Sequence, residues 1–130
     1  MSSVPDGVLD AWSGVDWGQF KFLAAIEEKG DSARQHVGLI AQQVLAAFNA
    51  QGMDACDYGI ACHDVWDDEY YEDTVTGEKT LISEAGETWM IRYTEALCME
   101  AAYQRRENAR LKKRIAGLEE RLAALELKVS

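Results

Sequence analysis

The segment RIAGLEERLAAL, residues 114–125, carries apolar residues at spacings that alternate between three and four. With Leu111 at heptad position d, the repeat extends in both directions. Its a and d positions are then Leu111, Ile115, Leu118, Leu122, Leu125 and Val129. An apolar period of 3.5 residues is typical of helices that supercoil around one another, not of a helix lying on a globular core. The sequence therefore predicts a coiled coil near the end of the chain.

Charged residues beside this apolar seam predict its geometry. In a parallel, in-register coil, each g residue lies near the e residue five positions later in a neighbouring chain. The three pairs are Glu107 with Lys112, Arg114 with Glu119, and Arg121 with Glu126, all opposite in sign. Asn108 occupies an a position, where a polar residue sets register at some cost in stability. The alternative interpretation is an amphipathic helix packed on its own domain.

Chain length limits the architecture to one domain. A coil of about three heptads is only marginally stable in water by itself, so it needs a globular part to stabilise it. With 130 residues and 48% hydrophobic composition, the chain suffices for one modest core. We predict an α+β, helix-dominated fold with a head over residues 1–93 and a long helix over residues 94–130. Small strands and short helices of the head pack on that helix.

The charge distribution excludes several classes of partner. The net charge is −10, and residues 104–130 carry eight Lys or Arg against four Glu, so the remainder carries −14. Such an acidic surface argues against nucleic acid as a partner. Apolar runs stay well short of the roughly 20 residues that span a bilayer, and residues 1–10 lack signal-peptide features, so we expect no membrane partner. Three cysteines without a CxxC pair indicate reduced thiols and a reducing cytoplasm.

Apolar spacing predicts the elements of the head. Val8, Leu9 and Trp12 follow Pro5 on one face of a short helix. A strand holding Phe20 and Phe22 on one face is expected to pair with residues 37–40, across a polar turn over residues 27–34. The next helix has Ile40, Val44 and Phe48 spaced four apart with Ala41 beside them, and Gly52 stands where a left-handed cap is needed.

Between residues 54 and 87 the pattern is weaker. YGIACHDVW predicts a strand, and TVTGEKTLI predicts a hairpin that turns near residues 76–78. TWMIRY alternates and places Trp89, Ile91 and Tyr93 on one face. The acidic stretch of residues 54–73 is interpreted either as an exposed arm or as a solvated loop.

No catalytic, metal or cofactor site is expected. Five side chains are capable metal ligands: Cys62, His63, Asp64, Asp67 and Asp68. Their spacing matches no zinc or EF-hand pattern, so a surface loop with a buried Cys62 is favoured. His36 is interpreted as a structural residue, and Trp12 and Trp89 as core residues. The glycines form no phosphate-binding loop.

The order of segments resembles a known family. An aromatic strand, HVGLIAQQV (residues 36–44), an acidic stretch, a segment closing in IRYTEAL (residues 91–97) and a heptad helix follow one another. This order is similar to the C-terminal intramolecular chaperone domain of phage endosialidases, tailspikes and tail fibres. VLDAW, EEKGDSARQHVGLIAQQV and RYTEALCMEAAYQRR resemble the tailspike and tail-fibre version. The core and motif residues are Phe20, Phe22, His36, Gly38, Ile40, Ala41, Gln42, Val44, Phe48 and Tyr93.

The resemblance implies a function. Three copies of such a domain trimerise, promote folding and registration of the upstream β-rich tailspike or fibre, and are released by autoproteolysis. The implied partners are two further copies of the chain and this client, in the bacterial host cytoplasm during phage assembly and transiently in the virion tail fibre. The trimer count comes from the resemblance alone, because Ile115 at a favours two strands and Leu122 at a blurs that preference.

The release chemistry departs from the family pattern. The family cleaves itself at its N-terminal edge with a serine in a Ser-Asp sequence and a lysine a few residues later. Here Ser2 and Ser3 precede VPDG, and Lys21 is the first lysine. We therefore expect that the chain starts after the cleavage motif and is not an enzyme as it stands. The alternatives are an oligomerisation module without chaperone activity, and a small hydrolase that uses the acidic stretch.

Overall fold

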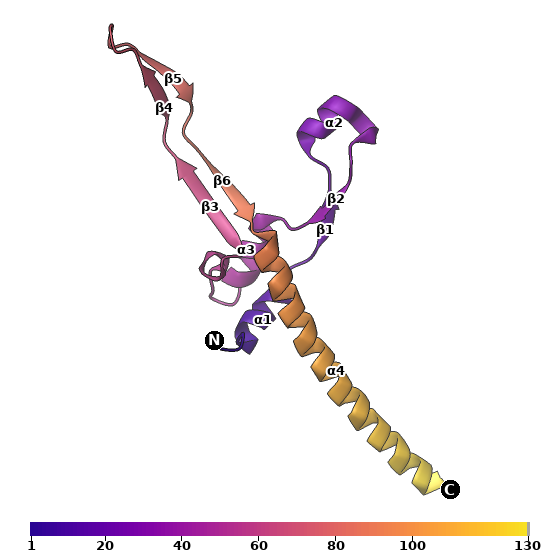
Figure 1. The fold of residues 1–130 in the computed structure, drawn as a ribbon. Helices are drawn as coiled ribbons and strands as arrows, with labels where there is room; N and C mark the ends of the chain where they lie inside the picture. Colours follow the sequence, from indigo (N-terminus) through magenta and orange to yellow (C-terminus); the bar gives the residue numbers. More distant parts are fainter. Residues whose placement is uncertain (130) are drawn as a thin grey trace.

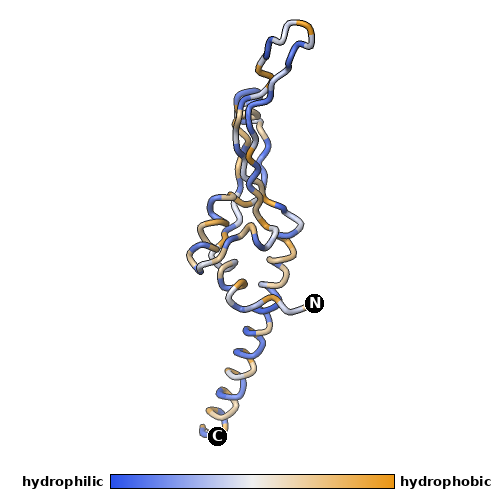
Figure 2. Tube along the Cα trace, turned by 90° about the vertical axis from the view of Figure 1, so that its left-hand side faces the viewer, coloured by the Kyte–Doolittle hydropathy of each residue, from blue (hydrophilic) through white to orange (hydrophobic). Residues whose placement is uncertain are grey.

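The computed structural model describes residues 1–129 and shows a small body from which an arm and a long helix project in opposite directions (Figures 1 and 2). The elements in chain order are α1 (Asp6–Trp12), β1 (Gly18–Phe20), α2 (Leu23–Lys29), η1 (Gly30–Ser32), β2 (His36–Gly38), α3 (Ala41–Asn49), η2 (Ala55–Tyr58), β3 (Ala61–Trp66), β4 (Glu69–Glu72), β5 (Lys79–Ser83), β6 (Gly86–Ile91) and α4 (Tyr93–Val129). The predicted α+β, helix-dominated class is confirmed.

The core of the body lies between α1, α3, η2 and the first turns of α4. Trp12, Val44, Phe48 and Ile60 are its largest fully buried side chains. The predicted core role of Val44 and Phe48 is confirmed, whereas that of Ile40 is wrong for the single chain, because Ile40 is 51% exposed. Ile40 precedes the first helical residue in an extended conformation, so helical spacing does not apply to it.

The first predicted hairpin is confirmed in its pairing and corrected in its bounds. β1 and β2 pair antiparallel, with Phe20 opposite His36. Phe22 lies beyond β1 and precedes α2, so Phe20 and Phe22 do not share a strand face. The rings of Phe20 and Phe22 nevertheless lie 5.3 Å apart, and both contact His36. Residues 27–34, predicted as a turn, contain the end of α2 and η1, because LAAIEEK consists mostly of good helix formers.

Of the two interpretations of the acidic stretch, the exposed arm is confirmed and the solvated loop is wrong, because residues 61–91 form an extended arm of two antiparallel ribbons (Figure 1). β3 pairs with β6 near the body, and β4 pairs with β5 at the far end. The predicted hairpin turn is confirmed, with Gly77 at φ +75°. Trp89 is only partly buried and stacks on His63, so its predicted core role is wrong: a two-stranded ribbon has no second layer to cover it.

α4 begins at Tyr93, one residue before the predicted boundary, and runs to Val129; position 130 lies outside the described residues. Ala96 is buried in the body, with Met99 and Tyr103 packed beside it. All residues from 108 to 129, which we call the tail, are exposed. Among residues 1–129, none of the helices has the length and apolar character needed to cross a membrane.

Candidate oligomer interface

The predicted seam residues lie on the tail, outside the body. Leu111, Ile115, Leu118, Leu122 and Leu125 are each between 53 and 57% exposed. The interpretation of an amphipathic helix packed on its own domain is therefore wrong for this segment. Figure 2 shows hydrophilic and hydrophobic stretches alternating along the tail. A single chain thus presents a continuous apolar stripe to solvent, which is the feature that a coiled-coil partner would cover.

The same helical face is uncovered beside the body. Leu97 lies two heptads before Leu111, at the same heptad position, and is 57% exposed. The body instead packs on the face that carries Ala96, Met99 and Tyr103. α4 therefore uses one face for its own core and leaves the seam face open along its whole length.

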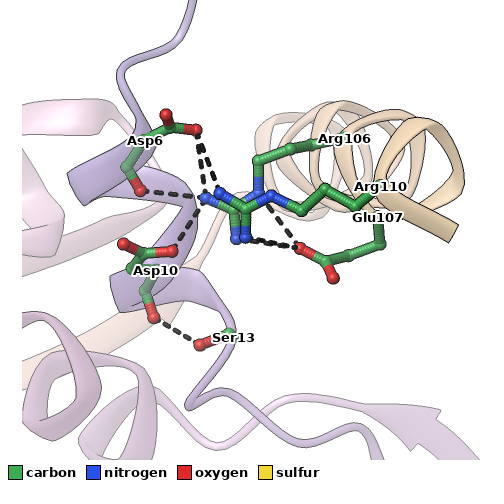
Figure 3. Close-up of polar contacts among 6 residues, drawn as sticks. All are labelled: Asp6, Asp10, Ser13, Arg106, Glu107 and Arg110. Carbon is green, nitrogen blue, oxygen red and sulfur yellow. Dashed lines mark hydrogen bonds and ion pairs between the residues drawn. The ribbon is translucent and has the colours of Figure 1, made fainter. Parts of the chain in front are cut away.

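An ionic cluster fixes α4 to α1 (Figure 3). The Arg106 guanidinium, only 11% exposed, lies 2.8 Å from the Asp10 carboxylate and 3.3 Å from that of Asp6. It also donates a hydrogen bond to the Asp6 carbonyl oxygen. Burial lowers the pKa of Arg106, but the hydrogen bonds to Asp10, Glu107 and Asp6 outweigh it and raise the pKa above its ordinary value. The cation is therefore firmly held in its charged form.

Glu107, predicted to form an inter-chain pair, belongs to this cluster in the single chain. Its Oε1 atom accepts hydrogen bonds from Arg106 at 3.0 Å and lies 3.6 Å from Arg110. Asp6, Asp10 and Glu107 together face two guanidinium groups, so the cluster has a net charge of −1. The other predicted ion-pair residues lie exposed along the tail: Lys112, Arg114, Glu119, Arg121 and Glu126. Asn108 is also exposed.

This cluster was not predicted from the sequence. Two signals were present, because Asp6 and Asp10 are four apart on α1, and Arg106 and Arg110 are four apart on α4. That spacing places each pair on one helical face. Nothing local in the sequence says that the two faces meet, since the cluster joins residues 100 positions apart. A second link was missed for the same reason: the Trp12 indole N–H donates to Glu100.

Two of the motif segments meet in space. The Tyr93 hydroxyl accepts a hydrogen bond from the Leu39 N–H at 3.2 Å and donates one to the Leu39 carbonyl oxygen. Gly38 lies directly beneath this hydroxyl, because a Cβ atom there would come within 2.5 Å of Tyr93 Oη. Only glycine fits without a shift. Of the neighbouring motif residues, Ala41 is buried and Gln42 is exposed.

The five potential metal ligands lie along the arm. Cys62, His63 and Asp64 follow one another on β3, so their side chains alternate between its faces. The imidazole of His63 pairs with Glu87 at 2.8 Å, and Asp68 accepts a hydrogen bond from the Ala85 N–H. Within residues 1–129, the structure gathers no group of three potential ligands around one point.

Comparison with known proteins assigns the family. The family model described as chaperone of endosialidase matches residues 2–53. The tail spike protein of Escherichia virus K5 is 49% identical over 117 residues, which are 89% of this chain and 18% of that protein. This chain thus spans less than a fifth of that relative's length.

Two solved structures agree. A crystal structure described as a novel intramolecular chaperone is 40% identical with a TM-score of 0.73, and the match covers 85% of this chain and 94% of that one. The carboxy-terminal domain of the bacteriophage T5 L-shaped tail fibre, with its intra-molecular chaperone domain, has the same fold at a TM-score of 0.63 and 19% identity, over 89% of this chain and 29% of that one. The chain therefore belongs to the chaperone-of-endosialidase family of intramolecular chaperone domains.

Proposed function

We propose that this chain is the trimerising chaperone domain of an upstream β-rich phage tailspike or tail fibre. The observation that carries the proposal is the open apolar seam on the tail of α4, which extends from Leu111 to Val129, whereas the body packs only on the first part of α4. The tail spike and tail fibre named above support the identity of the client. Leu111, Ile115, Leu118, Leu122, Leu125 and Val129 would form the inter-chain core, with Asn108 at one polar layer.

The physical benefit lies in the order of events. Interwoven β-structure from three chains forms slowly, and its unpaired strand edges aggregate meanwhile. Three chains joined by a coil associate further at an effective concentration that reaches roughly millimolar for short connections. A parallel coil also aligns the chains before their strands pair. If the domain is later removed, its contribution to unfolding is lost and the fibre is trapped kinetically.

The arm supplies a second part of the proposal. It leaves the body in the direction opposite to the tail (Figures 1 and 2). Residues 61–91 carry nine Asp or Glu and a single Lys. Such charge keeps exposed strand edges of neighbouring arms from pairing with one another. We assign the arm to the client side of the assembly. We place the chain in the host during phage assembly and transiently in the virion tail. We assign no enzymatic activity to it.

The first test is the mass of the assembly. Light scattering on the purified chain is expected to give about three times the chain mass of 14.5 kDa. A mass of 14.5 kDa that does not change with concentration would contradict the proposal.

The second test separates a chaperone from a passive oligomerisation module. A β-rich tailspike whose own chaperone domain has been removed is fused to this domain. One fusion carries the unmodified tail, and the other carries the seam-disrupted tail. The unmodified domain is expected to raise the yield of soluble trimeric client, and Ile115→Asp with Leu122→Asp is expected to abolish the increase. Equal yields from both fusions would favour the passive module. A triple change of Asp64, Asp67 and Asp68 to Asn tests the hydrolase alternative: it is expected to leave assembly unchanged, and loss of a hydrolytic activity present in the parent chain would favour the hydrolase.

A further inference from the structure

The three predicted ionic layers of the tail do not share one polarity. In the first layer the g residue is acidic and the e residue basic, namely Glu107 and Lys112. In the next two layers the order is reversed, with Arg114 before Glu119 and Arg121 before Glu126. All three layers pair opposite charges in a parallel coil without stagger. The inverted polarity of the first layer therefore adds no attraction between aligned chains. Its effect appears only when chains are displaced.

The apolar seam by itself permits displacement by one heptad. The d positions are leucine three times, at Leu111, Leu118 and Leu125, and the a positions that follow Asn108 are all aliphatic. Sliding one chain by seven residues therefore leaves most layers filled with equivalent side chains. An ionic pattern of uniform polarity would tolerate the same slip, because each g residue would still meet an e residue of opposite charge.

The inverted first layer penalises a slip in either direction. Displaced one way, Glu107 faces Glu119 of the neighbouring chain. Displaced the other way, Arg114 faces Lys112, and Glu107 faces Arg105 and keeps an opposite charge. Like charges at these positions repel, so the staggered arrangements lose electrostatic attraction that the aligned arrangement retains.

The structure ties the acidic residue of this first layer, Glu107, to the body. Glu107 is 30% exposed, and its Oε1 atom is bonded to Arg106, which is itself held by Asp6 and Asp10 of α1 (Figure 3). The cluster keeps a net charge of −1, so the layer remains attractive for a Lys112 ammonium and repulsive for a Glu119 carboxylate. Because α1 is also the helix nearest the N-terminus, this layer is anchored close to the start of the chain.

We propose that the inverted Glu107–Lys112 layer, anchored to α1 through Arg106, is an element that specifies zero stagger between the chains. This inference rests on the proposed parallel assembly. It assigns registration to this ionic layer in addition to the polar layer at Asn108, whereas the apolar seam supplies association.

The test compares staggered and aligned disulfides. Chains in which Cys56, Cys62 and Cys98 are changed to Ser carry either Leu111→Cys or Leu118→Cys, and the two kinds are co-produced and oxidised. A disulfide between the two kinds forms only across a one-heptad stagger, and disulfides within one kind report alignment. Exchanging the charges by Glu107→Lys with Lys112→Glu makes all layers uniform and is expected to raise the staggered fraction about tenfold.

Two further variants isolate the cause. Lys112→Glu alone leaves Glu107 and the α1 cluster intact, and is expected to raise the staggered fraction because Arg114 then attracts the displaced residue 112. Exchanging the last layer by Arg121→Glu with Glu126→Arg changes the same number of charges, and is expected not to raise it, since slipped Arg114 would meet an arginine. An unchanged staggered fraction in both of the first two variants would overturn this inference. A monomeric parent chain would instead overturn the proposed function.

Discussion

The body and the tail satisfy their apolar residues in different ways. In the body, Trp12, Val44 and Phe48 are completely buried within one chain, whereas every seam residue of the tail is more than half exposed. The two regions nevertheless share one helix, because α4 runs from the core of the body to the end of the tail. The body is therefore expected to be stable at any dilution, and the tail only where other chains are present. One chain thus separates folding from assembly.

The largest effect is expected from charges placed in the seam. Ile115→Asp with Leu122→Asp puts unpaired carboxylates into an apolar core, which costs several kcal/mol per assembly. We expect the mass from light scattering to fall to that of one chain while near-ultraviolet circular dichroism of the body persists. Ala116→Asp with Ala123→Asp is the matched control, because it adds the same charges at the same spacing on another face. Equal loss of assembly in both variants would contradict the heptad assignment.

A cavity in the body is expected to reduce the stability of the single chain, not its assembly. Phe48→Ala removes a fully buried ring and is expected to lower the free energy of unfolding by about 3–5 kcal/mol, at all protein concentrations. Urea unfolding followed by tryptophan fluorescence measures the loss. The control is Phe22→Ala, whose ring is 56% exposed and whose removal should cost under about 1 kcal/mol. A loss that depended on protein concentration would contradict the expectation that the body is stable without other chains.

The contact between the motif segments is expected to contribute less. Gly38→Ala would bring a methyl group against the Tyr93 hydroxyl and should cost about 1–3 kcal/mol through local displacement. Removing the hydroxyl by Tyr93→Phe relieves part of the clash, so the same glycine change should cost less in that background. Additive losses in this double-mutant cycle, measured by urea unfolding, would show that the two residues do not interact.

The smallest effect is expected at the junction between the two regions. Arg106→Gln removes the cation that joins Asp6 and Asp10 of α1 to α4, and should lower the melting temperature most at low ionic strength. Differential scanning calorimetry at low and high salt measures the difference. Arg105→Gln changes the exposed neighbouring residue and serves as the control. A loss of the same size at both salt concentrations would indicate packing instead of charge.

Much of the fold follows from local sequence. α1, α3, the β1–β2 pairing, the hairpin turn at Gly77 and the long α4 were each predicted from periodicity and turn residues, because these depend on neighbours along the chain. Prediction failed where a residue's environment comes from elsewhere. Ile40 has core spacing but precedes its helix, and Trp89 alternates like a core residue but lies on a ribbon that nothing covers.

The sequence by itself determined the heptad positions of the seam residues and the charges beside them, since heptad positions are a property of one helix. Tertiary structure alone decided which face of α4 the body covers, and that Glu107 is bound to Arg106 and through it to α1. It also decided that Gly38 lies under the Tyr93 hydroxyl. The link from Arg106 to Asp6 joins residues 100 positions apart, and the link from Tyr93 to Leu39 joins residues 54 positions apart, so these partners are fixed only when the whole body packs.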